Sequence, residues 1–316
     1  MRLLALFTLF FLLTSARGTA QETGSGLDFL NIGPSAALLS ISEASSAASV
    51  GPAAIYSNPA LLAFEDQSAL DVNYTLWIAD VKNQFAAVNL VNNKTAVAFG
   101  IYNSSADGFE ARDRPGPSAG NFSVGYLSLS GAAARRFGPL SLGITGQFLR
   151  EEVFQFRATG YALSAGAALR LFDDRLRAGA ALRNLGEMES LDQQSTTLPA
   201  ALSAGLSADL LKINTPGEND FPVLVTLLAD YTHQLEDPGT GDFVSSDSDD
   251  PYLSFATKIT AADLLFLSGG YRFGPTERPL SFGGGLALDI ATIRYALVPF
   301  STGFGTVHSF GMQYHF

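Results

Sequence analysis

Apolar and polar residues alternate along most of the chain from Ser68 to its end. Strict alternation is typical of an extended strand that has one face in apolar and one in polar surroundings. The final residues, HSFGMQYHF, place Phe310, Met312, Tyr314 and Phe316 on one face and small or polar residues on the other. Similar stretches recur often enough to predict fourteen strands, and single-chain bacterial outer-membrane barrels have even numbers of strands.

The other clear strands show the same division, and their charged residues fall on the polar face. A cationic side chain on the lipid face near mid-bilayer costs about 2 to 4 kcal/mol, so this distribution fits a barrel. A soluble sandwich also keeps charge off its apolar face. The clearest apolar rows are Leu70/Val72/Tyr74/Leu76, Leu140/Leu142/Ile144/Phe148, Tyr161/Leu163/Ala165/Ala167/Leu169, Leu202/Ala204/Leu206/Ala208/Leu210 and Leu280/Phe282/Gly284/Leu286/Leu288, and the charged residues are Asp71, Arg170, Arg177, Arg183, Asp209, Asp230, Lys258, Arg272 and Arg294.

The lengths of the connections distinguish these two folds better. Connections after even-numbered strands are mostly short, whereas three after odd-numbered strands are long, namely Asn103 to Asn121, Leu185 to Leu198 and His233 to Pro251. Barrels have short periplasmic turns and longer external loops. The stretch from Leu211 to Asp220 is an exception, being long where a short turn is expected. We therefore predict that residues 67–316 form an all-β, antiparallel transmembrane barrel of about 14 strands, with a soluble sandwich or another all-β fold as the alternative.

The first 66 residues do not alternate. Residues 1–20 have Arg2, an apolar run from Leu3 to Leu13 and a small-residue site ending at Ala20, which is typical of a cleavable signal peptide. The alternative, an anchoring helix, is less favoured because a span needs about 20 apolar residues. Residues 21–66 are too apolar for a free tail, and we expect them to form a plug in or under the barrel, with a short helix within residues 44–50.

Composition narrows the function. Charged residues make up 16% of the chain, which is low beside the roughly 25% of soluble domains and fits a surface in contact with outer-membrane lipid. The chain has no Cys, so neither disulfides nor thiolate-bound metals contribute. A formal net charge of −11 argues against nucleic acid as a partner.

Several short motifs resemble a known family. Tyr56, Asn58, Pro59 and Ala60 match the Tyr-x-Asn-Pro-Ala signature shared by FadL-like barrels and the PorV/PorQ family. Three further stretches are similar to PorV/PorQ landmarks: Trp77 to Val81 (which includes Asp80), Leu182 to Gly186, and Leu198-Pro199. The final strand, which ends on Phe316, resembles the signal that the barrel assembly machinery recognises.

This resemblance implies a fourteen-stranded, FadL-like barrel in the cell outer membrane. Characterised PorV proteins act in type IX secretion, where they bind cargo and partner proteins without enzymatic chemistry. A hydrophobic conduit of the FadL type is the alternative function. We favour secretion from sequence, because FadL relatives are longer and because the inward rows here are Ser, Gly, Thr and charged residues. Fold alone does not decide between the two.

No motif predicts an enzyme, a cofactor or a metal site. Gly116 to Gly120 matches G-x-S-x-G around Ser118, but no helix pattern follows as hydrolases require. The acidic stretch from Asp237 to Asp250 could bind Ca²⁺, yet it lacks the spacing of a twelve-residue calcium loop. His308 and His315 fall on opposite faces of one strand. We therefore expect that the match around Ser118 is due to chance, that the acidic stretch is a solvated loop, and that the histidines have structural roles.

Overall fold

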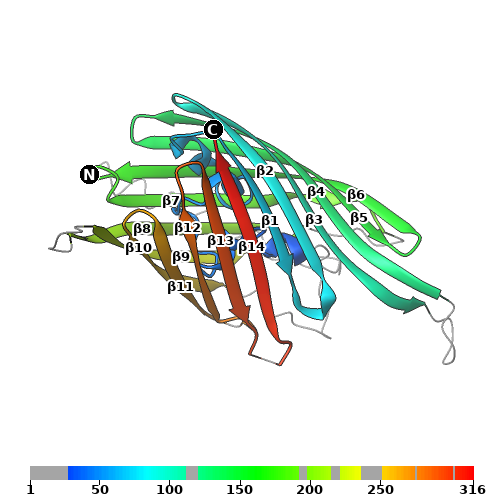
Figure 1. Ribbon diagram of the computed structural model, residues 1–316. Coiled ribbons are helices and arrows are strands. Elements are labelled where there is room, and N and C mark those ends of the chain that lie inside the picture. The colour runs from blue at the N-terminus through cyan, green and yellow to red at the C-terminus, as the bar shows by residue number, and fades with distance from the viewer. Residues whose placement is uncertain are drawn as a thin grey trace.

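The computed structural model describes residues 28–111, 120–191, 198–214, 221–235, 251–274, 276–301 and 303–316. Fourteen antiparallel strands form one closed barrel in which every strand pairs with its neighbours in sequence, and β1 pairs with β14 (Figure 1). The strands are β1 (Ala69–Leu76), β2 (Lys82–Asn92), β3 (Thr95–Ala111), β4 (Gly120–Phe137), β5 (Leu140–Val153), β6 (Phe156–Leu171), β7 (Leu176–Met188), β8 (Ala201–Asn214), β9 (Pro222–Gln234), β10 (Tyr252–Ala261), β11 (Leu265–Phe273), β12 (Leu280–Ala287), β13 (Ala291–Pro299) and β14 (Thr306–His315).

The expected apolar rows point outward. Ile144 and Leu163 are 65% and 66% exposed, whereas Ser141 and Thr145 on the opposite face of β5 are buried. An outer surface made of uncovered aliphatic and aromatic side chains is stable only in contact with lipid. The closed barrel and its apolar exterior confirm the predicted fold, and the alternative of a soluble sandwich is wrong.

Strand β14 closes the barrel. Strand β1 is paired with it along the whole length of β1, where Leu70 lies opposite Tyr314 and Val72 opposite Met312. Phe310, Met312, Tyr314 and Phe316 are all at least 43% exposed on the outer surface. Closure leaves no strand edge with unpaired backbone groups, which is the condition for a sheet to span a bilayer.

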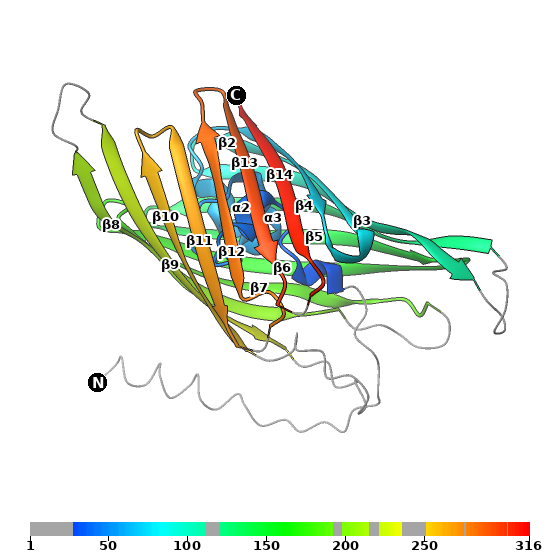
Figure 2. The ribbon, with the colours of Figure 1, turned by 60° about the horizontal axis from the view of Figure 1, so that its bottom comes forward.

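Strand lengths are uneven, and this corrects two predicted connections. Strand β3 has 17 residues and β4 has 18, whereas β12 has 8. Figure 2 shows β3 and β4 continuing beyond their neighbours. In the stretch predicted as a loop from 103 to 121, residues 103–111 belong to β3 and residues 120 and 121 to β4, and β8 continues through residues 211–214. Both faces of a strand that extends beyond its neighbours can contact water, so apolar and polar side chains need not alternate along it. The backbone groups of the extension are still hydrogen-bonded, because β3 and β4 pair with each other there.

Residues 28–66, called the inner segment here, lie inside the barrel (Figure 1). They form short helical turns instead of one domain: η1 (Asp28–Asn31), α2 (Ala36–Leu39), η2 (Gly51–Ala53), α3 (Ala54–Ser57) and η3 (Pro59–Phe64). The helix expected within 44–50 is absent from this described stretch. Helix α2 forms instead because the Ser35 hydroxyl caps its N-terminus by accepting a hydrogen bond from Leu38 N.

Three predictions fall outside the described residues: the signal peptide at 1–20, the nucleophile motif around Ser118, and the acidic stretch 237–250. Within the described part of the chain, no helix combines the length and the hydropathy needed to cross a bilayer.

Candidate functional site

The irregular backbone of the inner segment obtains its hydrogen bonds from the barrel wall. Inside a barrel, backbone groups without secondary structure still need partners. Thr145 Oγ1 donates to the Ile55 carbonyl at 3.0 Å, and Ser141 Oγ donates to the Ala60 carbonyl at 2.7 Å. Ser46 N donates to Asp230 Oδ2 at 2.7 Å. Polar side chains on the inner faces of β5 and β9 therefore help to hold the inner segment in place.

Tyr56 joins the inner segment to β4. Its hydroxyl accepts a hydrogen bond from Ser130 Oγ at 2.9 Å and lies 3.3 Å from Ser128 Oγ. Its ring packs edge-on against Phe85 and Tyr102, with ring centroids 5.8 and 5.9 Å apart. Burial raises the pKa of Tyr56 above its ordinary value, and its hydrogen bonds with the two serines only partly offset that rise. The phenol is therefore neutral and acts as a packing and hydrogen-bonding group.

Asn58 is the best-connected residue of the Tyr-x-Asn-Pro-Ala motif. Its side chain is fully buried, and Nδ2 donates to the Ser46 carbonyl at 2.7 Å and to the Ala167 carbonyl at 3.2 Å. Its Oδ1 accepts from Ala60 N at 3.1 Å and so caps η3, with Pro59 at the first helical position. Motif residues 56 to 60 therefore act together to position the inner segment against β4, β5 and β6.

Close approach of the inner segment to the wall requires glycine at Gly143. A Cβ placed there would lie 2.5 Å from the Pro59 carbonyl carbon and 2.6 Å from Ala60 N, both of which are backbone atoms. Neither atom can move away by a change of rotamer. The inner segment thus packs directly on the backbone of β5.

A buried ion-pair cluster holds the other end of the inner segment. Glu43 Oε1 accepts from Arg278 Nη1 at 3.0 Å and from Gly33 N at 2.8 Å, and Glu43 Oε2 accepts from Arg272 Nη2. Burial alone would raise the pKa of Glu43, but the charges of Arg278 and Arg272 outweigh it and lower the pKa to about 2. The carboxylate is therefore ionised at neutral pH and ties the inner segment to β11 and to the connection after it.

Trp77 and Asp80 lie elsewhere, in the connection between β1 and β2. The guanidinium of Arg278 stacks over the Trp77 ring at 5.3 Å, and Phe300 packs edge-on against the same ring at 5.8 Å. Asp80 is exposed. The structure thus separates the predicted site residues into three places: residues 56–60 inside the barrel, Trp77 and Asp80 at one rim, and the β14 row on the outer surface.

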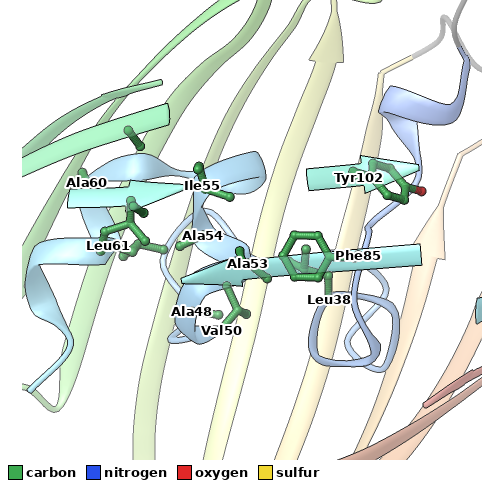
Figure 3. Packing of buried hydrophobic residues seen from close by; sticks show 14 of the residues in the cluster. Leu38, Ala48, Val50, Ala53, Ala54, Ile55, Ala60, Leu61, Phe85 and Tyr102 are labelled. Carbon is green, nitrogen blue, oxygen red and sulfur yellow. The ribbon is translucent and has the colours of Figure 1, made fainter. Parts of the chain in front are cut away.

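An aromatic cluster, formed by Phe29, Phe85, Tyr102, Tyr126 and Leu149, lies inside the barrel beside strands β2 to β5. Phe85, Tyr102 and Leu149 are at most 2% exposed and project inward from β2, β3 and β5. Phe29 of η1 stacks on Tyr126 of β4, with ring centroids 5.3 Å apart. Figure 3 shows Phe85 and Tyr102 in one cluster with side chains of the inner segment. The prediction of purely small, polar or charged inward rows therefore holds only for part of the wall.

Neither the Glu43 cluster nor the aromatic cluster was predicted from the sequence. Glu43 and Arg278 are 235 residues apart, and no local spacing connects them. The Phe85 and Tyr102 side chains could have been found, because both fall on the inward parity of their strands. Among the described residues, no group of three His, Asp or Glu side chains is arranged to hold a metal ion.

Comparisons with known proteins identify the fold. No family model matches the chain, and no curated protein matches it. Three similar solved structures are aromatic-compound channels or transporters. The CymD monoaromatic hydrocarbon channel has a TM-score of 0.61 at 13% identity and covers 92% of this chain and 99% of its own. The toluene transporter TodX of Pseudomonas putida has a TM-score of 0.55 at 14% identity, and the match covers 94% of this chain and 99% of TodX. The toluene transporter TbuX of Ralstonia pickettii has a TM-score of 0.54 at 14% identity, and the match covers 90% of this chain and 98% of TbuX.

These similarities extend over nearly the whole barrel in each case, but identities of 13 to 14% establish the fold only. They support the FadL-like part of the expected resemblance and give no support to the PorV/PorQ family in particular. The chain is therefore a closed, fourteen-stranded barrel with the FadL-like outer-membrane fold.

Proposed function

We propose that this protein is a conduit for small hydrophobic molecules in the cell outer membrane, with no enzymatic step. CymD, TbuX and TodX, which share its fold, are described as hydrocarbon channels or toluene transporters. This favours the conduit over secretion, the function that the sequence motifs favour. Outer-membrane lipid is then its surroundings, and the barrel assembly machinery inserts it.

The aromatic cluster inside the barrel is the observation that carries this proposal. Phe29 occupies it now, with its ring 5.2 Å from Tyr102 and 5.3 Å from Tyr126. A small apolar ligand that took the place of Phe29 would gain the same burial, worth about 25 cal/mol per Å². The inner segment must move for this exchange, because its side chains fill the space. Movement of residues 28–43 is therefore the proposed opening step.

A reversible tether tests this step, since the chain has no Cys of its own. The Oγ atoms of Ser42 in the inner segment and Ser281 in β12 lie 2.8 Å apart, so a cysteine pair there fits a disulfide. We expect Ser42→Cys with Ser281→Cys to abolish uptake of radiolabelled toluene into cells with an intact lipopolysaccharide layer. Reduction of the disulfide should restore uptake.

The matched control places the same bond within the wall. Thr75 of β1 and Ser309 of β14 also have hydroxyl oxygens close together, 2.6 Å apart, but both belong to the barrel. Thr75→Cys with Ser309→Cys should leave uptake unchanged in both redox states. Equal uptake by the oxidised inner-segment tether and this control would contradict a moving inner segment, and uptake no higher than in cells without the protein would contradict the conduit.

A PorV/PorQ-type role in type IX secretion remains a second proposal, for which two observations speak. Residues 56–60 and the Trp77 region carry the family-like motifs, and β3 and β4 project beyond their neighbours as a surface that partner proteins could contact (Figure 2). Recovery of the barrel from native outer membranes decides between the two. Co-purified secreted proteins that share a C-terminal β-domain would support secretion, whereas co-purified apolar small molecules without such proteins would support the conduit.

A further inference from the structure

The barrel interior contains a cavity with an unusual set of charges. Its volume is about 250 Å³, and it lies between the inner segment and strands β7 to β13. Three cationic side chains line it, Arg177, Lys258 and Arg294, with a single carboxylate, that of Asp209. The cavity wall is therefore net cationic, although the whole chain is strongly acidic.

The strand register explains how these groups come together. Asp209, Thr226, Lys258 and Ser268 are directly paired in turn across β8, β9, β10 and β11, so they form one row on the inner face. Neighbouring strands are about 4.8 Å apart, which puts the backbones of Asp209 and Lys258 about 10 Å from each other. Thr226 lies between them and donates its hydroxyl to Asp209 Oδ1 at 2.6 Å. Asp209 is thus engaged by Thr226.

The cations lack direct carboxylate partners. Among the described residues, no ion pair is formed by Arg177, Lys258 or Arg294. Arg294 Nη1 donates to the neutral Gln313 at 2.8 Å, and Lys258 Nζ lies 4.8 Å from the Phe266 ring centroid. Asp71 and Glu65 act on Arg294 only at longer range. Arg177, Lys258 and Arg294 are half-buried, and cationic groups that are largely removed from water without a carboxylate partner are costly, so this arrangement favours a bound anion.

Two further polar atoms in the lining have no partner. Arg177 Nε and Ser268 Oγ are buried without any hydrogen bond within the described part of the chain. Both are donors that a carboxylate oxygen could accept from. The rest of the lining mixes small hydroxyl side chains, such as those of Ser207 and Thr260, with an apolar part formed by residues that include Leu224, Leu228 and Phe266. The cavity thus combines cationic donors with an apolar surface.

We propose that this cavity binds a small organic carboxylate, with its charged end among Arg177, Lys258 and Arg294 and its apolar body against Phe266 and Leu228. A volume of about 250 Å³ corresponds to about eight water molecules in the liquid, so the ligand has roughly that number of heavy atoms. This goes beyond the proposed function, since a neutral hydrocarbon cannot form ion pairs or hydrogen bonds with the three cationic side chains. It is also independent of it, because binding to the closed barrel requires no transport.

Equilibrium dialysis of the purified full-length chain in a non-ionic detergent tests the site. Benzoate is the probe, toluene is its uncharged analogue of similar size, and inorganic phosphate is an anion without an apolar body. We expect saturable benzoate binding at one site and no competition by toluene at equal concentration. Lys258→Met should weaken benzoate binding at least tenfold, and Asp209→Asn should strengthen it several-fold because it removes the only carboxylate of the lining.

Arg183→Gln is the matched control. Arg183 lies on β7 like Arg177 and faces the interior, but it does not line this cavity. It should leave benzoate affinity unchanged. The proposal is overturned if wild-type protein does not bind benzoate, if phosphate binds and benzoate does not, or if Arg183→Gln weakens binding as much as Lys258→Met. Toluene uptake that persists in Lys258→Met would leave the conduit intact, so failure of one proposal does not imply failure of the other.

Discussion

Replacing Glu43 by Gln should release one end of the inner segment. Glu43 is ionised and pairs with both Arg272 and Arg278, and its side chain is only 11% exposed. Its pKa falls from 4.5 to about 2 in the folded barrel. At 1.36 kcal/mol per pKa unit, this shift corresponds to about 3 kcal/mol of stabilisation at neutral pH. Loss of that amount raises the population of the opened segment roughly a hundredfold.

Hydrogen exchange measured by mass spectrometry tests this value. Peptides that cover residues 33–45 should exchange about a hundred times faster in Glu43→Gln than in wild type, because Gly33 N also loses its charged acceptor at 2.8 Å. Glu152→Gln is the control: Glu152 likewise pairs with two arginines, Arg150 and Arg157, but is 39% exposed on its side chain. Exposed pairs contribute little, so its exchange should match wild type.

The lowered pKa of Glu43 also predicts that the attachment of the inner segment depends on pH. A lowered pKa in the folded state means that the stabilisation is complete above about pH 4.5 and is lost as pH falls toward 2. Trp77 is the only tryptophan, and Arg278 stacks over its ring, so its fluorescence reports release of that arginine. Wild type should show a transition between these pH values, and Glu43→Gln should not. Unchanged exchange in Glu43→Gln, or the same pH transition in both proteins, would refute the role given to this ion-pair cluster.

Three other substitutions test the packing. Gly143→Ala should lower the free energy of unfolding by about 1 to 3 kcal/mol through overpacking against the inner segment. Gly146→Ala should leave the free energy of unfolding unchanged, because Gly146 is on the outward face of the same strand and a Cβ there would lie 3.9 Å from the nearest side-chain atom. Equal denaturant midpoints for the two variants would contradict the direct packing of the inner segment on Gly143. Asn58→Ala should speed amide hydrogen exchange in residues 46–60, because it leaves buried carbonyls without donors and so lowers local stability by about 1 to 3 kcal/mol. Hydrogen exchange as slow as in wild type would contradict the role of Asn58 in holding the inner segment. Ile144→Arg should lower the free energy of unfolding of the barrel in vesicles by about 2 to 4 kcal/mol, whereas Phe137→Arg, near a turn, should lower it by about 1 kcal/mol or less. Unfolding is measured by Trp77 fluorescence. Equal losses for the two variants would contradict a position of Ile144 near the middle of the bilayer.

The outward surface was predictable residue by residue. Val72, Ile144 and Leu163 were assigned to the lipid face from alternation alone, and they are 47%, 65% and 66% exposed. This works because a strand's side chains alternate by geometry, and lipid tolerates only one class of side chain on that face. The strand extensions of β3 and β4 were missed for the same reason, since water on both faces imposes no such selection.

The interior was not predictable in this way. The inner segment has no period, and its contacts reach across the chain: Ser42 bonds to Ser281, 239 residues away. The inward positions of Arg177, Lys258 and Arg294 followed from parity, but their convergence on one cavity did not. The sequence by itself thus determined a closed barrel, its outward face and the polar character of much of its lining, because local strand geometry and lipid act on every second residue. Only the tertiary structure decided which inward residues meet the inner segment and which meet each other, because barrel register and closure bring together groups that no local pattern relates.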